Sequence, residues 1–257
     1  MLPSDPHEFQ AQAIEEGRNL SSAWRTYWAK HQHLESDRLP DSSLAVIAGL
    51  AAHVDKLAEQ GFNLIEQGEW LVAMPLVRTA YECAIRAQWL QQVPDAGKSF
   101  LAEDSRQMKN FLKTLTESDN ATMLNAAGAM AHRVVDEFGK STAQAKRFDK
   151  ACDDLDGAGV EAYAYYRAMS TYCHPSVILA EQYMEDHGHS VRLLDTAKSD
   201  GAGAWAALLS ASLVWATAVV EFSARDAQFK REIRRAATAL SVPFVMQPSP
   251  EARRRSS

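Results

Sequence analysis

Arg167 and His174 are the two residues of this sequence whose types and spacing could most directly perform chemistry. They stand seven positions apart in the stretch YYRAMSTYCHPS, residues 165–176. In an α-helix, seven residues at about 100° each bring two side chains to within about 20° of one another around the axis. An imidazole can exchange a proton near neutral pH, and a guanidinium can neutralise a phosphate oxygen. The pair would therefore suit cleavage of a phosphodiester bond.

Ser170 and Thr171 add two hydroxyl groups on or near the same helix face. Pro175 disfavours helical geometry at the residue before it, so we expect His174 to lie where the chain leaves the helix. The structural alternative is that His-Pro is an ordinary helix ending and that Arg167 is an ordinary arginine two turns earlier. The spacing by itself leaves both interpretations open.

A second group of charges, Arg78, Glu82 and Arg86, recurs every four residues in LVRTAYECAIRAQWL. Its surroundings are strongly apolar, and a buried charge needs a partner. The structural interpretation is a ladder of ion pairs that joins neighbouring helices. The functional interpretation is that these side chains line the cleft around His174 and orient its imidazole.

The elements that must position these residues are helices. The chain has 257 residues, of which 46% are hydrophobic, with only 12 glycines and 9 prolines. Almost every segment has apolar residues at the 3.6-residue spacing of a helix, and almost none alternates like a strand. We expect one all-α domain over residues 1–242, a bundle of mostly antiparallel long helices. The expected helices cover about 5–34, 42–68, 71–92, 98–116, 121–138, 142–153, 160–174, 176–185 and 202–240.

The two ends of the last helix raise separate questions. Residues 201–220 carry no charge, but their Ala, Gly and Ser content favours a buried core helix over a membrane span. From Phe222 to Ser257 the chain has eight Lys or Arg against three Asp or Glu, although its net charge is −6. Residues 243–257 carry little apolar surface, and we expect them to be a disordered basic tail. Such a tail could contact nucleic acid, but a solvated chain end is the commoner case.

The sequence lacks the motifs that mark several classes of enzymes and nucleotide-binding proteins. The chain has no HExxH, P-loop, GxGxxG or GxSxG sequence. The acidic turn CDDLDGAG places a cysteine and a tyrosine where a calcium loop needs oxygen ligands. Three cysteines without paired spacing indicate a reducing compartment, and the N-terminal residues show no signal peptide. We therefore expect a cytoplasmic protein that needs no metal and no cofactor.

Two of these stretches together resemble an uncharacterised group of bacterial helical proteins. In that group an Arg-x-x-x-Glu helix is followed by a Ser-x-x-x-His-Pro helix end. The matching residues are Arg78 with Glu82, and Ser170 with His174 and Pro175. The resemblance covers about residues 71–185.

The group is similar to the HEPN superfamily of helical domains, many of which are metal-independent ribonucleases with an arginine four to six residues before a histidine. Six residues lie between Arg167 and His174 in this sequence. The resemblance implies a homodimer in which the two Arg-His helices face each other and cleave RNA. His174 would handle the 2′-hydroxyl proton, Arg167 would stabilise the pentacovalent phosphate, and Ser170, Thr171, Arg78 and Glu82 would support them. It also suggests a toxin or phage-defence role.

The alternative function is a helical interaction or regulatory module that performs no chemistry. Its Arg-His face would bind a nucleotide, an RNA or a partner protein. Ala168 favours this alternative, because active HEPN motifs usually carry a polar residue directly after the arginine. The acidic body of the chain favours it too. A structure can distinguish the endoribonuclease from the non-catalytic module, because the enzyme needs a His174 side chain that is accessible to RNA and not buried against the backbone.

Overall fold

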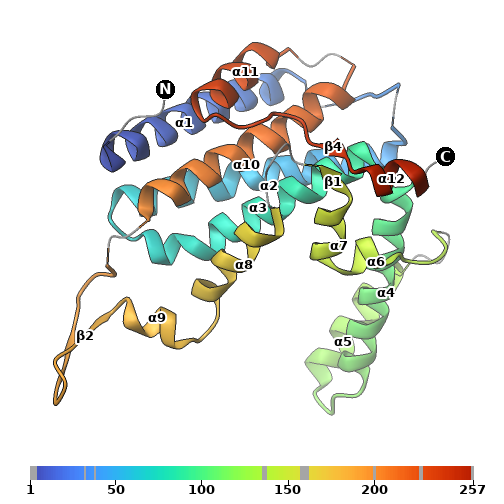
Figure 1. The fold of residues 1–257 in the computed structure, drawn as a ribbon. Coiled ribbons are helices and arrows are strands. Elements are labelled where there is room, and N and C mark those ends of the chain that lie inside the picture. The colour runs from blue at the N-terminus through green and yellow to red at the C-terminus, as the bar shows by residue number, and fades with distance from the viewer. Residues whose placement is uncertain are drawn as a thin grey trace.

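Helices dominate the computed structural model, which describes residues 5–31, 33–37, 39–134, 138–156, 162–198, 201–225 and 228–255. These residues form twelve α-helices, one 3₁₀ turn and four strands of two or three residues. The prediction of an all-α bundle is confirmed (Figure 1).

Four long helices form the core of the molecule. They are α1 (Pro6–Lys30), α2 (Asp41–Glu66), α3 (Trp70–Gln92) and α10 (Ala202–Ser223). Asp5 caps α1 by accepting a hydrogen bond from the backbone N–H of His7 at 2.8 Å. A turn of three residues joins α2 to α3, and Gly68 adopts the left-handed φ of +82° that this reversal requires. The chain therefore returns along itself, as expected for antiparallel neighbours.

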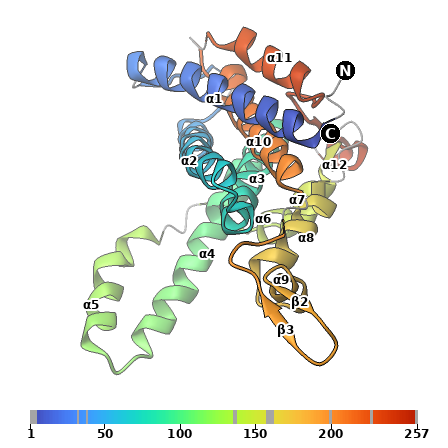
Figure 2. The same ribbon diagram turned by 90° about the vertical axis from the view of Figure 1, so that its left-hand side faces the viewer.

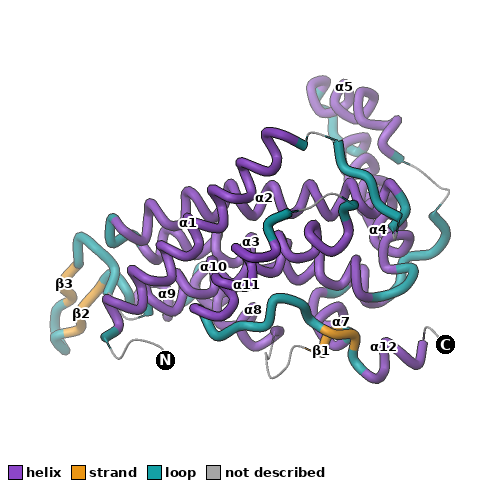
Figure 3. Tube along the Cα trace, turned by 90° about the horizontal axis from the view of Figure 1, so that it is seen from above, coloured by secondary structure: helices purple, strands orange, loops and turns teal. Residues whose placement is uncertain are grey.

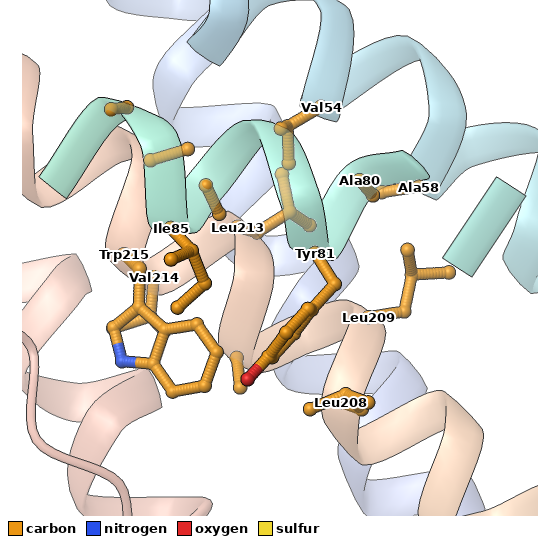
Figure 4. Close-up of a cluster of buried hydrophobic side chains, with 14 of the residues drawn as sticks. Val54, Ala58, Ala80, Tyr81, Ile85, Leu208, Leu209, Leu213, Val214 and Trp215 are labelled. Atoms are coloured by element: carbon orange, nitrogen blue, oxygen red, sulfur yellow. The ribbon is translucent and has the colours of Figure 1, made fainter. Parts of the chain in front are cut away.

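The centre of the core lies where α2, α3 and α10 meet (Figure 4). Tyr81 of α3 and Trp215 of α10 are fully buried, with ring centroids 5.9 Å apart in an edge-to-face arrangement. Alanines such as Ala58 and Ala80 let the helix backbones approach closely around these large rings. This burial of large aromatic and small aliphatic side chains supplies the main apolar contribution to stability.

Helix α10 is the uncharged segment that the sequence marks as a core helix. Among the described residues it is the one helix long and apolar enough to cross a membrane by length and composition. However, 78% of its most apolar window is buried inside the protein. Its buried Ser210 hydroxyl also donates to the carbonyl of Ala13 on α1 at 2.6 Å. The interpretation as a core helix therefore agrees with its packing.

An arm of two helices extends away from the core (Figures 1 and 2). It consists of α4 (Ala96–Thr116), α5 (Ala121–Met130) and the 3₁₀ turn η1 (Ala131–Arg133). Asn120 caps α5 by accepting from the N–H of Thr122 at 2.8 Å. Helix α5 is shorter than the predicted 121–138, of which residues 135–137 lie outside the described part of the chain.

A second projection carries the Arg-His stretch on the same side of the bundle (Figures 1 and 2). Short elements lead to it and follow it: α6 (Ala143–Lys146), α7 (Phe148–Asp153), β1 (Leu155–Asp156), α8 (Ala162–Cys173), α9 (Val177–Glu181), β2 (Met184–Asp186) and β3 (Val191–Leu193). The predicted helix over 176–185 is wrong beyond Glu181. There the chain forms an antiparallel hairpin in which Met184 faces Leu193, because the glycine of the DHGHS turn takes a φ of +78°.

The predicted final helix over 202–240 is two helices, α10 and α11 (Lys230–Ala239). Helix α10 ends because Ala224 is extended and the N–H of Arg225 donates to the carbonyl of Glu35 at 2.8 Å. The Arg225 guanidinium also pairs with Glu35 and Asp37. A contact with a residue 190 positions earlier breaks the helix, which no local pattern shows.

The prediction of a disordered tail over 243–257 differs from the structure, which describes residues up to 255 (Figure 3). The segment contains β4 (Gln247–Pro248), which pairs with β1, and α12 (Pro250–Arg255). Met246 and Ala252 are each only 1% exposed. The tail folds because the body of the protein supplies buried partners for its backbone and its last arginine, as described below.

Candidate functional site

Helix α8 positions the Arg-His pair, and the chain turns sharply after it. The helix ends at Cys173, and His174 is the first residue beyond it. Ser176 fixes the turn from both sides, because its hydroxyl donates to the carbonyl of Thr171 at 2.9 Å and accepts from the N–H of Leu179 at 3.1 Å. His174 therefore lies at the helix exit, where Pro175 predicts it.

Arg167 and His174 are both exposed to solvent. Within the part of the chain that the structure describes, neither side chain forms a hydrogen bond or an ion pair. At a rise of 1.5 Å per residue, Arg167 lies about 9 Å along the helix axis from Cys173, the residue directly before His174. Two unoccupied basic groups at this spacing could contact neighbouring phosphates of a bound strand, or one phosphate with a second copy of the helix.

The two hydroxyl residues of this face are turned toward their own helix. Ser170 donates to the carbonyl of Tyr166 at 2.8 Å, and Thr171 donates to the carbonyl of Ala168 at 2.7 Å. Both hydroxyls have used their single proton, so they can only accept a hydrogen bond from a ligand in this arrangement.

Arg78 connects α3 to the site helix through an aromatic ring. Its Nη2 donates to the hydroxyl of Tyr166, and its guanidinium carbon lies 4.7 Å from the centre of that ring. Tyr166 also packs against Phe148 of α7, with centroids 4.5 Å apart. Since Tyr166 directly precedes Arg167, the half-buried Arg78 helps to set the rotation of α8 against the core.

The predicted ladder of ion pairs through Glu82 is not formed. No ion pair within 4.0 Å joins Glu82 to Arg78 or to Arg86. Arg86 instead donates to the carbonyl of Gln144 at 2.8 Å, and its guanidinium lies 5.6–6.0 Å from three aromatic rings. Burial lowers the pKa of Arg86, and the nearby charge of Glu82 opposes that shift. Aromatic faces and a carbonyl thus replace the expected carboxylate partner.

Neither Arg167 nor His174 lines any of five pockets that the described residues form. These five pockets lie along α1 and α2, between α1 and α11, and between α4 and residues 139–146. Among the same residues, no three His, Cys, Asp or Glu side chains gather as metal ligands.

Two features of this region cannot be predicted from the sequence. The sequence suggests that Tyr166 is one more aromatic residue of the core, whereas in the structure its hydroxyl accepts a hydrogen bond from Arg78. A basic pocket on the α4 arm draws Arg106 and Lys109 from one segment and Lys140 and Lys146 from another. Neither segment alone has a conspicuous run of positive charge, so no local sequence pattern predicts this pocket.

Comparison with known proteins identifies the family of the chain. No curated protein and no solved structure matches the chain. The family described as "Family of unknown function (DUF5677)" matches residues 44–191. The matched region is more than half of the chain and contains both the Arg78–Glu82 segment and the Arg167–His174 segment. The chain therefore belongs to the DUF5677 family of unknown function.

Proposed function

We propose that this protein is a HEPN-like, metal-independent endoribonuclease in which Arg167 and His174 act on the RNA. The observation that carries the proposal is that both side chains are exposed, Arg167 on α8 and His174 directly after its last residue, and that neither is engaged within the described residues. A histidine buried against backbone would have excluded the reaction. The resemblance to HEPN proteins supplies the reaction class and suggests a cytoplasmic toxin or phage-defence role.

The reaction that suits this pair is an internal transfer within the RNA strand. His174 accepts the proton of a 2′-hydroxyl while the 2′-oxygen attacks the adjacent phosphorus. Arg167 stabilises the negative charge of the pentacovalent phosphate. The bond from phosphorus to the 5′-oxygen then breaks, and that oxygen takes a proton. The products are a 2′,3′-cyclic phosphate and a 5′-hydroxyl, and water is not consumed.

In this proposal a homodimer encloses the surface that carries Arg167 and His174. Directly after His174 in the chain, α9 exposes Val177 at 70% and Ile178 at 44%, and farther along the same projection β3 exposes Val191 at 57% and Leu193 at 79%. Several exposed aliphatic side chains on one projection are typical of an interaction surface. A second copy on this surface would bring two Arg-His helices together and exclude water from the phosphate.

Arg78 acts in this proposal as a positioning residue. It holds Tyr166, and through Tyr166 the segment of α8 that presents Arg167. Among the described residues Glu82 forms no hydrogen bond or ion pair with that segment, and its effect is the negative charge that it places near Arg86. Ser170 and Thr171 support the helix end through their backbone hydrogen bonds.

The test is RNA cleavage in EDTA by the full chain and by His174→Ala and Arg167→Ala. We expect wild type to cleave single-stranded RNA and each variant to lose roughly a hundredfold or more of the rate, the usual contribution of one acid-base or charge-stabilising group. His7→Ala and Arg231→Ala are matched controls, since both residues are exposed and lie on α1 and α11, outside the projection that carries α8. Circular dichroism establishes that each variant is folded, and light scattering on the same samples gives the number of copies.

Cleavage that persists in both the Arg167→Ala and the His174→Ala variant would contradict the proposal. Absence of cleavage by wild type, together with RNA binding that Arg167→Ala weakens, would instead support the non-catalytic module. Ala168 favours that second function, because an exposed methyl group stands beside Arg167 where active HEPN motifs usually have a polar residue.

A further inference from the structure

Helix α8 carries aromatic side chains that the packing of the core leaves exposed. Of the three exposed aromatic side chains among the described residues, Tyr163 and Tyr165 lie on this helix and Phe111 lies on α4. Tyr163 is 38% exposed and Tyr165 is 47% exposed. Within the described part of the chain, neither phenol hydroxyl forms a hydrogen bond. The helix that presents Arg167 therefore also presents two rings that a ligand can reach.

Only one of these two rings shares a helix face with Arg167. Tyr163 stands four residues before Arg167, which places the two side chains about 40° apart around the helix axis and about 6 Å apart along it. Side chains at this spacing are neighbours on a helix surface. Tyr165 stands two residues before Arg167, about 200° away around the axis. Tyr163 is therefore the aromatic neighbour of the guanidinium, and Tyr165 lies on the other side of α8.

The Tyr163 ring is held in place from the core side. It stacks on the ring of Tyr166, with centroids 6.0 Å apart and ring planes inclined by 18°. Tyr166 in turn packs against Phe148 and accepts the hydrogen bond from Arg78. Because Tyr166 lies against one side of the Tyr163 ring, the exposed part of that ring is its other side and its edge. A ring that is fixed before binding loses little conformational entropy when a ligand stacks on it.

A flat ring beside an unpaired guanidinium offers two contacts that suit one nucleotide of single-stranded RNA. The base can stack on a tyrosine ring, and the phosphate can pair with an arginine. Stacking uses the face of a base, which every base possesses, so it selects nucleotides without selecting a sequence. In a duplex the faces of a base are covered by its neighbours, so the base that stacks on the protein must be unpaired.

We propose that Tyr163 stacks on an unpaired RNA base adjacent to the phosphate that Arg167 contacts. The inference rests on the proposed endoribonuclease function and names the substrate of that site as single-stranded RNA. In this arrangement Tyr163 contacts the base and not the reacting atoms, so its role is to select and orient the strand. Tyr165, on the other side of the helix, has no part in it.

The test measures binding of a single-stranded RNA with 2′-O-methyl groups, which attack by the 2′-oxygen cannot cleave, by fluorescence anisotropy at constant ionic strength. We expect Tyr163→Ala to lose about fivefold to a hundredfold in affinity, the range for one base stacked on an aromatic ring. Tyr163→Trp should bind at least as tightly as wild type. Tyr165→Ala is the matched control and should bind like wild type, because it removes the same ring from the other side of α8. Circular dichroism establishes that each variant is folded.

An abasic strand separates stacking from a structural effect of Tyr163 on α8. This strand has the same 2′-O-methyl backbone and no bases, so the difference in affinity between wild type and Tyr163→Ala should disappear when it is used. The proposal is overturned if Tyr163→Ala binds the intact strand as tightly as wild type, if it weakens binding of both strands equally, or if wild type does not bind the intact strand.

Cleavage of ordinary RNA in EDTA, measured with the same proteins, keeps this inference distinct from the proposed function. If wild type cleaves RNA and Tyr163→Ala binds the intact strand normally, the endoribonuclease stands and base stacking is refuted. If Tyr163→Ala weakens binding of the intact strand alone and wild type does not cleave, base stacking is supported and the site belongs to the non-catalytic module.

Discussion

At the residue scale, Glu103 shows how the partners of one carboxylate set a measurable property. Hydrogen bonds from Arg106, with further ones from Gln107 and Ser141, lower its pKa from an ordinary 4.5 to about 2. Because the folded-state pKa lies below the unfolded one, the interaction stabilises the protein above about pH 4.5 and is lost as the pH falls toward 2. We expect Glu103→Gln to lower the free energy of unfolding at pH 7 by roughly 2 kcal/mol, since Arg106 is half exposed and solvent screens part of the pairing.

The measurement is urea unfolding of wild type and Glu103→Gln at several pH values between 7 and 2.5. The two stabilities should converge as the pH falls. Glu117→Gln serves as the control, because that carboxylate is exposed at the end of the same helix, 3.7 Å from Lys113. A constant gap between wild type and Glu103→Gln down to the lowest pH would show that the carboxylate contributes packing and not charge.

At the element scale, the crossing of α1 over α2 and α10 depends on a glycine. A Cβ added at Gly17 would overlap the ring of Phe62 and stand 2.5 Å from the hydroxyl oxygen of Ser210. The buried Ser210 hydroxyl is itself committed to the carbonyl of Ala13. We therefore expect Gly17→Ala to lower the free energy of unfolding by about 1–3 kcal/mol, as overpacking of a core does, although alanine is the better helix former.

Thermal unfolding followed by circular dichroism tests this effect, with Gly49→Ala as the matched control. Gly49 is in the interior of α2, and an added Cβ there meets nothing within 4 Å. The same substitution should raise stability by up to about 1 kcal/mol through helix propensity alone. Changes in stability of opposite sign in the two variants would support a close helix crossing at Gly17. An increase in stability in both variants would refute it.

At the scale of the whole molecule, Gln88 joins the C-terminal segment to the core. Its fully buried amide donates to the carbonyl of Trp215 at 2.8 Å and accepts from the N–H of Met246 at 3.0 Å. Trp215 donates in turn to the carbonyl of Pro243 at 2.6 Å. We expect Gln88→Leu to cost about 1–3 kcal/mol, because it leaves the buried N–H of Met246 without an acceptor. It should also speed hydrogen exchange across residues 243–255.

Hydrogen exchange read by mass spectrometry locates the change, and Gln91→Leu is the control because Gln91 is only partly buried on the same helix. Exchange in α5, far from the C-terminal segment, should stay unchanged in both variants. Equal protection of residues 243–255 in Gln88→Leu and wild type would mean that other contacts hold the segment. The main such contacts surround buried Asp154, which accepts from Trp89 and Arg255.

The sequence by itself determined the features that depend on neighbours along the chain. The 3.6-residue spacing of apolar side chains predicts the helical class, and Pro175 predicts that His174 stands at a helix exit. The absence of charge over 201–220 predicts the core helix α10. Helical periodicity also places Arg167, Ser170 and His174 on one face, which is the part of the candidate site that local geometry decides.

Tertiary structure decided everything that depends on residues far apart. Helix α10 ends before Arg225 because Glu35 and Asp37 lie beside that residue. Residues 243–255 fold because the buried polar groups of Gln88 and Asp154 form hydrogen bonds with them. Arg78 takes a tyrosine in place of Glu82, and the basic pocket exists because Gly139 turns one segment over another. The physical reason is common to all four. A buried polar or charged group must find a partner, and only the folded chain determines which partner is near.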